Sequence, residues 1–217
     1  MEKATVDGEW LINAVAHALR NPIFAALLQA ELLAARTVEP AAHKVYDHLR
    51  RLESTIEEML LYGRPAEVEA HPTHIEPVLR LVAESFAEGN RGETAQIEIE
   101  VEPKGCRALA DSDALRIILE RIIENAAQHT PSPHVVRVHA AAGDEGVEIV
   151  VSDEGEGIAE EIQKKLFLPF FPQHKGRAGL GLAIAAKFAA AIGATLMVTS
   201  APGSGTRVTV RLAPADS

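Results

Sequence analysis

The chain has 217 residues, of which 47% are hydrophobic and 24% are charged, and its formal net charge at pH 7 is −10. This length allows one large domain or two small ones, and the composition is that of a folded globular protein rather than a disordered one. The excess of negative charge argues against a general affinity for nucleic acid or for an anionic membrane surface, so we expect no nucleic-acid partner.

Cysteine content and hydropathy indicate the compartment. Cys106 is the single cysteine, and the N-terminus lacks the apolar core of a signal peptide. A single cysteine cannot form an intramolecular disulfide framework, which favours a reducing compartment. No apolar run approaches the ~20 residues that a membrane-spanning helix needs. We therefore expect a cytoplasmic protein with no membrane segment in this chain.

The first elements are two amphipathic stretches on either side of a break at Thr37–Ala42. In both stretches apolar residues recur at alternating steps of three and four, the spacing of one helix face. These residues are Ile12, Val15, Leu19, Ile23, Ala26, Ala30 and Leu33, and then Ala42, Val45, Leu49, Leu52, Ile56 and Met59. The pattern predicts an antiparallel helical hairpin. Because two helices cannot bury such stripes alone, we expect a homodimer that forms a four-helix bundle.

His17 lies opposite this apolar stripe on a helical wheel, so its imidazole is expected to point outward. Asn21 lies one turn further along the same face, and Phe24 and Leu28 continue that face. An exposed histidine beside an apolar pair suits a docking surface; the alternative is that these residues widen the core of the bundle. Neutral imidazole is a nucleophile near pH 7. Pro22, inside the helix, predicts a kink.

The pattern changes at Gly63–Pro72, where a glycine and two prolines predict a linker. Beyond it, helices are expected at Ile75–Phe86, Asp113–Gln128 and Leu180–Ile192, and strands at Gln96–Val101, Val135–Ala140, Val147–Ser152, Thr195–Ser200 and Thr206–Leu212. We therefore expect an α+β protein in which residues 1–64 form the hairpin. Residues 73–217 are expected to form an α/β sandwich with helices on one face of a sheet.

Two glycine-rich loops in the second half have the features of a nucleotide pocket. Asp153 follows an apolar strand and opens the sequence DEGEGI, in which Gly155 and Gly157 allow a close approach of the backbone. The sequence GRAGLGLAIA then runs from Gly176 into a predicted helix, and such a helix N-terminus presents N–H groups to phosphate. Alone, DEGEGI is also typical of a structural turn and GLGLAI of tight helix packing, whereas the two together favour a nucleotide site.

Four segments follow one another in a fixed order: HALRNP at His17–Pro22, ENAAQHT at Glu124–Thr130, DEGEGI and GLGLAI. In this order the chain resembles a sensor histidine kinase over residues 6–212. The resemblance implies a phospho-acceptor hairpin followed by an ATP-binding domain of the Bergerat fold, which gyrases and chaperones share. It implies that His17 takes the γ-phosphoryl group of ATP and passes it to an aspartate of a response regulator receiver domain.

The resemblance also assigns roles around the nucleotide. It implies that Asp153 accepts a hydrogen bond from the adenine amino group, next to Gly155 and Gly157. Asn125 is implied to coordinate Mg²⁺ on the phosphates, although an asparagine near a helix end also serves as a cap or turn residue. His129 matches a position that contacts phosphate or ribose in the family.

The second glycine-rich loop is implied to cradle the phosphates. Gly179, Leu180 and Gly181 form the part of the loop that enters the helix. Lys175 and Arg177 flank it, either as cations that contact phosphate or as solvated loop charges.

Ala18 departs from the family pattern. Histidine kinases usually carry a carboxylate there, which accepts a proton from the ring of the acceptor histidine, and a methyl group cannot do so. Loss of a general base typically costs ~10²–10⁴ in rate. Asn21 keeps the position that orients water for dephosphorylation of the partner. Two alternatives thus stay open: a histidine phosphotransferase or response-regulator phosphatase with weak kinase activity, and a non-catalytic nucleotide-sensing dimeric scaffold.

Arg121 is the second departure. Histidine kinases usually carry a further asparagine one turn before the one that Asn125 matches, and Arg121 occupies that position. A cation there either displaces Mg²⁺ or faces a phosphate itself. Nucleotide affinity tolerates this change better than catalysis does.

Overall fold

The computed structural model describes residues 2–37, 39–89, 95–130, 134–171 and 178–215. The chain forms two compact units, of which the first runs to Pro65 and the second begins at Ala66. Of the described residues, the first unit also includes 170–171 and 178–180. The boundary between Pro65 and Ala66 lies between residue 64, where we expect the first domain to end, and residue 73, where we expect the second to begin.

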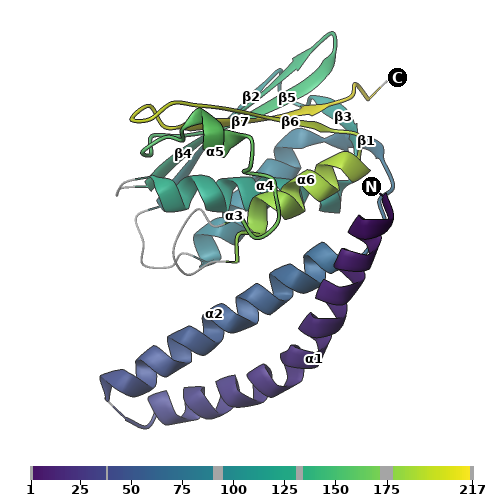
Figure 1. The fold of residues 1–217 in the computed structure, drawn as a ribbon. Helices are drawn as coiled ribbons and strands as arrows, with labels where there is room; N and C mark the ends of the chain where they lie inside the picture. Colours follow the sequence, from purple (N-terminus) through teal and green to yellow (C-terminus); the bar gives the residue numbers. More distant parts are fainter. Residues whose placement is uncertain (1, 38, 90–94, 131–133, 172–177, 216–217) are drawn as a thin grey trace. The chain divides into compact units, whose positions relative to one another are not determined.

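The first unit is built on a helical hairpin of α1, Glu2–Ala34, and α2, Pro40–Gly63 (Figure 1). Proline suits the start of α2, because the first N–H groups of a helix have no helical partner. Pro22 lies inside α1, and the axis of α1 bends, as an interior proline predicts. The predicted hairpin is confirmed.

The predicted seam of the hairpin is only partly right. Among the side chains of the hairpin whose burial the structure describes, the buried apolar ones are Ala16, Leu27, Ala30, Ala42 and Ile56, and Ala16 and Leu27 were not in the predicted stripe. Five predicted members, Val15, Leu19, Leu33, Val45 and Leu52, are instead between 42% and 59% exposed. The reason is geometric: one partner helix covers a narrower sector of a helix than this stripe occupies. Together with Leu11, these five residues form the uncovered strip.

The helix α1 also bears on the membrane expectation. Its segment Leu11–Ala34 is long and apolar enough to cross a membrane, and the most apolar 18-residue window has a mean hydropathy of 1.3. This qualifies the expectation that the chain has no such segment. The criterion is weak, because helices that pack in soluble proteins also meet it.

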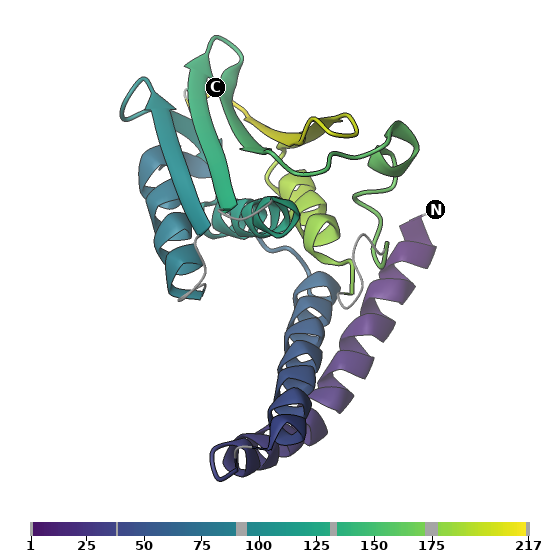
Figure 2. The ribbon, with the colours of Figure 1, turned by 90° about the vertical axis from the view of Figure 1, so that its left-hand side faces the viewer.

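In the described residues, the second unit contains a five-stranded mixed sheet (Figures 1 and 2). Its strands, in spatial order, are β2 Ala95–Glu102, β4 His134–Gly143, β5 Gly146–Asp153, β7 Thr206–Leu212 and β6 Thr195–Ser200. The β2–β4 pair is parallel and the other pairs are antiparallel. The helices α3 Ile75–Gly89, α4 Ser112–His129 and α6 Gly181–Ala191 cover one face. The predicted sandwich is confirmed.

The core of this unit lies between the sheet and the helices. Alternate residues of the central strands are buried because successive side chains of a strand point to opposite faces: Val136, Val138, Ala140, Val147, Ile149, Val151, Val208, Val210 and Leu212. On α4 the buried side chains include Leu115, Ile118, Leu119, Ile122 and Ile123. Since these residues occupy one side of α4, the partly exposed Arg121 and Asn125 lie away from the core.

Three short elements were not predicted. Strand β1, His71–His74, pairs with β3, Arg107–Ala110, and α5 covers Glu160–Gln163. The predicted linker is therefore wrong at its end, where His71 and Pro72 already belong to β1. Strand β1 could not be recognised because its sequence has no apolar alternation. It is held by hydrogen bonds to residues far along the chain, such as the one that the Thr73 hydroxyl donates to the Ala110 carbonyl at 2.7 Å.

Candidate functional site

Asp153 ends β5, and its carboxylate holds the loop that follows. The Oδ1 atom accepts hydrogen bonds from the Gly155 N–H at 2.8 Å and the Thr206 N–H at 3.2 Å. Within the described residues, no donor is found for Oδ2, so this oxygen can accept a hydrogen bond from a ligand. Burial raises the pKa of the Asp153 carboxyl above its ordinary value, although the N–H groups of Gly155 and Thr206 act in the opposite direction.

A network centred on Ser200 braces the loop after Asp153. The Ser200 hydroxyl accepts from the Ile158 N–H at 2.8 Å and donates to the Gly205 carbonyl at 2.6 Å. The side-chain amide of Gln163 donates to the carbonyls of Ile158 and Ser200 at 2.7 and 2.8 Å. Sequence reasoning missed Gln163 and Ser200, because no local pattern links residues that lie about forty positions apart.

Gly155 and Gly157 are required by the packing of the loop itself. A Cβ on Gly155 would meet the backbone carbonyl of His129, and would lie 2.8 Å from Oδ1 of Asp153. Gly157 has a φ of +71°, and a Cβ there would collide with the Ala201 carbonyl. The closeness of these glycines to a nucleotide base stays a prediction.

The helix α4 carries the next candidates. Asp111 caps its N-terminus by accepting from the Ala114 N–H at 2.9 Å, and it also accepts from the Glu69 N–H at 3.0 Å. Further along, partly exposed Asn125 lies one turn after Arg121.

No cluster of three or more His, Cys, Asp or Glu side chains in the described parts of the chain suits a metal ion. The residues present nevertheless fit Mg²⁺ with a nucleotide, because Mg²⁺ takes hard oxygen ligands and usually binds through few protein groups plus substrate phosphates. The amide oxygen of Asn125 is an oxygen donor of this kind, and its role as a ligand stays a prediction.

The start of α6 is the candidate phosphate loop. Gly179 has a φ of +67°, and a Cβ there would meet the backbone of Phe171. Leu180 is buried, and Gly181 is the first residue of α6. Lys175 and Arg177 lie outside the described residues, so their predicted contacts stay predictions.

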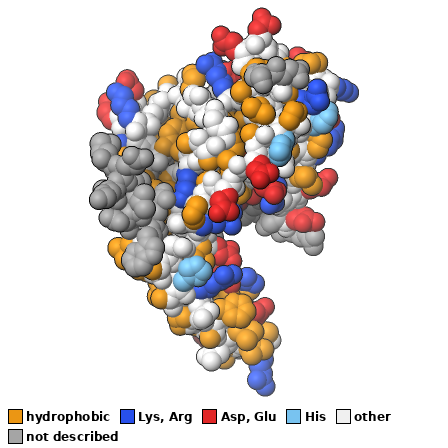
Figure 3. All heavy atoms as spheres, turned by 90° about the vertical axis from the view of Figure 1, so that its right-hand side faces the viewer, with side chains coloured by type: hydrophobic (Ala, Val, Ile, Leu, Met, Phe, Trp, Pro, Cys, Tyr) orange, Lys and Arg blue, Asp and Glu red, His pale blue; other side chains and the backbone are white. Residues whose placement is uncertain are grey.

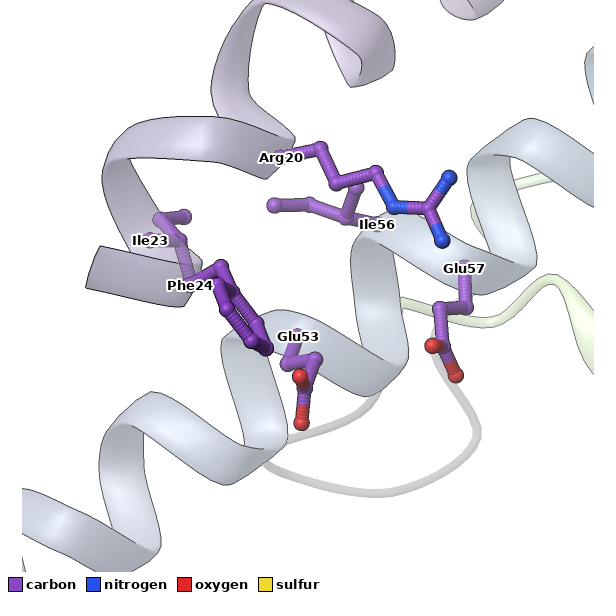
Figure 4. Close-up of a pocket in the computed structure, with 6 residues that line it drawn as sticks. All are labelled: Arg20, Ile23, Phe24, Glu53, Ile56 and Glu57. Carbon is purple, nitrogen blue, oxygen red and sulfur yellow. The ribbon is translucent and has the colours of Figure 1, made fainter. Parts of the chain in front are cut away.

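The candidate nucleophile lies in the other unit. His17 and Asn21 are exposed on α1, as predicted. A pocket of about 160 Å³ lies between α1 and α2 (Figure 4). It is lined by Arg20, Ile23, Phe24, Glu53, Ile56 and Glu57, so it begins three residues after His17. Phe24 is 60% exposed, which fits the predicted docking surface better than a role in the hairpin core.

Two known protein families match this chain. Residues 11–67 match the His Kinase A (phospho-acceptor) domain. Residues 110–216 match the histidine kinase-, DNA gyrase B-, and HSP90-like ATPase family. The first match includes His17, and the second includes Asn125 and both glycine-rich loops.

The chain is 32% identical to the sensor-like histidine kinase SenX3 of Mycobacterium tuberculosis over 226 residues, which cover 98% of this chain and 54% of that protein. It is 28% identical to the sensor histidine kinase ZraS of Klebsiella oxytoca, over 98% of this chain and 48% of that protein. The full-length crystal structure of ShkA in complex with AMPPNP superposes with a TM-score of 0.76 at 28% identity, and the match covers 93% of this chain and 45% of that chain. The chain thus spans about half the length of these proteins.

Proposed function

Because this chain belongs to the sensor histidine kinases, through its phospho-acceptor and ATPase domains, we propose that it is the kinase core of a two-component signalling system. ATP phosphorylates His17, and the phosphoryl group then passes to an aspartate of a response regulator receiver domain. The observation that carries this proposal is the exposed His17 on one matched domain, together with the available Oδ2 of Asp153 on the other.

In this proposal the ATP-binding domain expected at residues 73–217 binds the nucleotide. Oδ2 of Asp153 accepts the adenine amino group, and His129 contacts ribose or phosphate. Asn125 holds Mg²⁺, which neutralises charge on the phosphate oxygens when it is bound.

The backbone at Gly179, Leu180 and Gly181 donates to the phosphates, because N–H groups at a helix N-terminus favour anions. Lys175 and Arg177 add positive charge beside this loop.

The chemical step takes place at the imidazole of His17. A neutral ring nitrogen forms a bond to the γ-phosphorus, while the bond from that phosphorus to the bridging oxygen breaks and ADP leaves with the electron pair. The ring must also lose the proton on its other nitrogen, and Ala18 offers no acceptor for it. We therefore expect slow autophosphorylation compared with a kinase that has a carboxylate at this position.

The pocket beside His17 supports docking of the response regulator. Phe24 offers an exposed apolar side chain to this pocket, and the charged residues Arg20, Glu53 and Glu57 also line it (Figure 4). Such an apolar centre with a charged rim is typical of a protein interface. In this proposal Asn21, which follows the pocket residue Arg20 on α1, orients water for dephosphorylation of the bound regulator.

The uncovered strip supports a homodimer. Its side chains, which include Leu19 and Leu52, would pack against the same strip of a second chain in a four-helix bundle. Hydrophobic side chains are visible on the hairpin surface in the lower part of Figure 3. Packing in a dimer also accounts for the apolar composition of α1 without a membrane. The single cysteine supports a cytoplasmic location.

Incubation with γ-labelled ATP and Mg²⁺, beside a His17→Ala control, tests the proposal. We expect a label that acid removes and alkali does not, in the wild type alone. Absence of label in a protein that binds ATP would contradict it. The phosphotransferase, phosphatase and scaffold alternatives are not favoured, because a relay needs neither glycine-rich loop and the relatives are kinases.

A further inference from the structure

The hydrogen bonds around Asp153 continue beyond its own loop into the turn between β6 and β7. The peptide that joins Gly205 to Thr206 is bound on both sides. Its N–H donates to Oδ1 of Asp153 at 3.2 Å, and its carbonyl accepts from the Ser200 hydroxyl at 2.6 Å. Because a peptide unit is planar, a bond that fixes its carbonyl also fixes the direction of its N–H. Ser200 therefore orients a donor that holds the Asp153 carboxylate.

The side chain of Gln163, on α5, holds Ser200 in turn. Its Nε2 donates to the Ile158 carbonyl at 2.7 Å and to the Ser200 carbonyl at 2.8 Å. Carbonyl oxygens only accept, so the NH₂ end of the amide has to face them, with one proton for each. The Ile158 N–H donates to the Ser200 hydroxyl at 2.8 Å, which leaves the hydroxyl proton for the Gly205 carbonyl. One amide thus joins the end of the Asp153 loop to the end of β6.

Backbone bonds hold the same two segments together in the middle. The Gly203 N–H donates to the Glu156 carbonyl at 2.6 Å, and the Gly205 N–H donates to the Gly155 carbonyl at 3.1 Å. Gln163 contributes through its side chain, so it can be replaced without breaking these backbone bonds. Its two hydrogen bonds are partly buried, where water replaces a lost partner poorly. Its removal should therefore loosen the loop rather than unfold the domain.

We propose that Gln163 is a positioning residue for base recognition, which acts through Ser200 to fix the Asp153 carboxylate so that Oδ2 accepts adenine and rejects guanine. The inference rests on the proposed function, because it assumes that adenine binds at Asp153. Adenine carries an amino donor where guanine carries an oxygen acceptor. A carboxylate oxygen only accepts, so a fixed Oδ2 favours adenine. A carboxylate that can turn away from the base loses part of this preference.

Calorimetric titration of the full chain with AMPPNP and with GMPPNP, its guanine counterpart, tests this in the presence of Mg²⁺. Gln163→Met keeps the length of the side chain and removes both donors, and Ser200→Ala removes the hydroxyl. Each should weaken AMPPNP binding about 2- to 10-fold, the range for one neutral hydrogen bond, and leave GMPPNP binding unchanged. Glu160→Gln is the matched control, because Glu160 lies on the same helix in an exposed pair with Lys164 at 3.1 Å. It should bind both nucleotides like the wild type.

A double variant separates positioning from a general defect of the fold. If Gln163 acts through Asp153, Gln163→Met should cost no further AMPPNP affinity in the Asp153→Asn background. An equal loss in both backgrounds would overturn the proposal. So would an equal loss for AMPPNP and GMPPNP, or wild-type AMPPNP affinity in both Gln163→Met and Ser200→Ala. If the wild type itself binds AMPPNP no better than GMPPNP, the proposed contact between Asp153 and adenine fails, and absence of any nucleotide binding would contradict the proposed function.

Discussion

Replacing Asp153 by asparagine changes a single atom at the centre of the nucleotide site. Asparagine keeps an oxygen in the place of Oδ1, so it can still accept from the N–H groups of Gly155 and Thr206. It replaces Oδ2 by an NH₂ group, which donates. In the proposed pose this donor faces the adenine amino group, which also donates, so the hydrogen bond to the base is lost while the loop keeps its own bonds.

The magnitude follows from the charge on the acceptor. A hydrogen bond to a charged group contributes about 1.5–3 kcal/mol, which corresponds to an increase in Kd of about 10- to 150-fold. Nucleotide affinity should fall, whereas the free energy of unfolding should stay the same or rise. Burial raises the pKa of the Asp153 carboxyl, so the ionised form costs free energy in the folded state. A raised carboxyl pKa lowers stability as the pH rises from about 4 through the folded pKa, and a neutral amide avoids this loss at pH 7.

Calorimetric titration with AMPPNP and a thermal unfolding scan at pH 7 measure the two effects together. We expect Asp153→Asn to bind far more weakly and to unfold at the same or a higher temperature. Glu154→Gln, the matched control at the next position, removes an exposed carboxylate that pairs with Arg137 at 2.6 Å, and should bind like the wild type. Wild-type affinity in Asp153→Asn would refute the assignment of Oδ2 to the base.

Three further predictions concern other parts of the chain. Asp111→Ala removes the cap of α4 and the bond from the Glu69 N–H, and should lower the free energy of unfolding in urea by about 2 kcal/mol at pH 7. Burial raises the pKa of Asp111, but these N–H bonds lower it further, so the net pKa is below its usual range. The stabilisation by the ionised Asp111 carboxylate should be present at neutral pH and lost as the pH falls below about 4. An equal difference in the free energy of unfolding between wild type and variant at pH 7 and at pH 2 would contradict this. Leu52→Lys places a charge in the uncovered strip and should convert a dimer into a monomer in light scattering, whereas the same change at Leu81, a leucine of similar exposure on α3, should not. Ala18→Glu adds a proton acceptor beside His17 and should speed autophosphorylation by about 10²–10⁴-fold in a single-turnover assay, and an unchanged rate would contradict this.

The parts of the fold that have a strong local pattern could be predicted from the sequence. The alternation Val147, Ile149, Val151 fixed the face of β5 that meets the helices, because a strand has a period of two. The position of Asp153 at the end of that strand followed directly. Exposure of His17 followed in the same way from the period of 3.6 residues in α1.

Other features depend on contacts that no local window contains. The helical period indicated that Leu19 and Leu33 lie on one face of α1. Which part of that face α2 covers depends on the angle at which the two helices pack. The brace from Gln163 to Ser200 joins residues on different elements, so its polar side chains resemble ordinary surface residues in sequence. Arg121 was recognisable as unusual from the sequence, but only the structure shows that its side chain lies beside Gly181 at the start of α6.

Ala18, the departure from the family pattern beside His17, acts on one step of the proposed reaction. A carboxylate at this position would accept a proton only in the chemical step, so its absence lowers the maximal rate. Interactions that hold ATP equally well in the ground state and in the transition state set the ATP concentration at half-saturation instead, and Ala18 leaves them in place. We therefore expect a chain that binds ATP but phosphorylates His17 slowly.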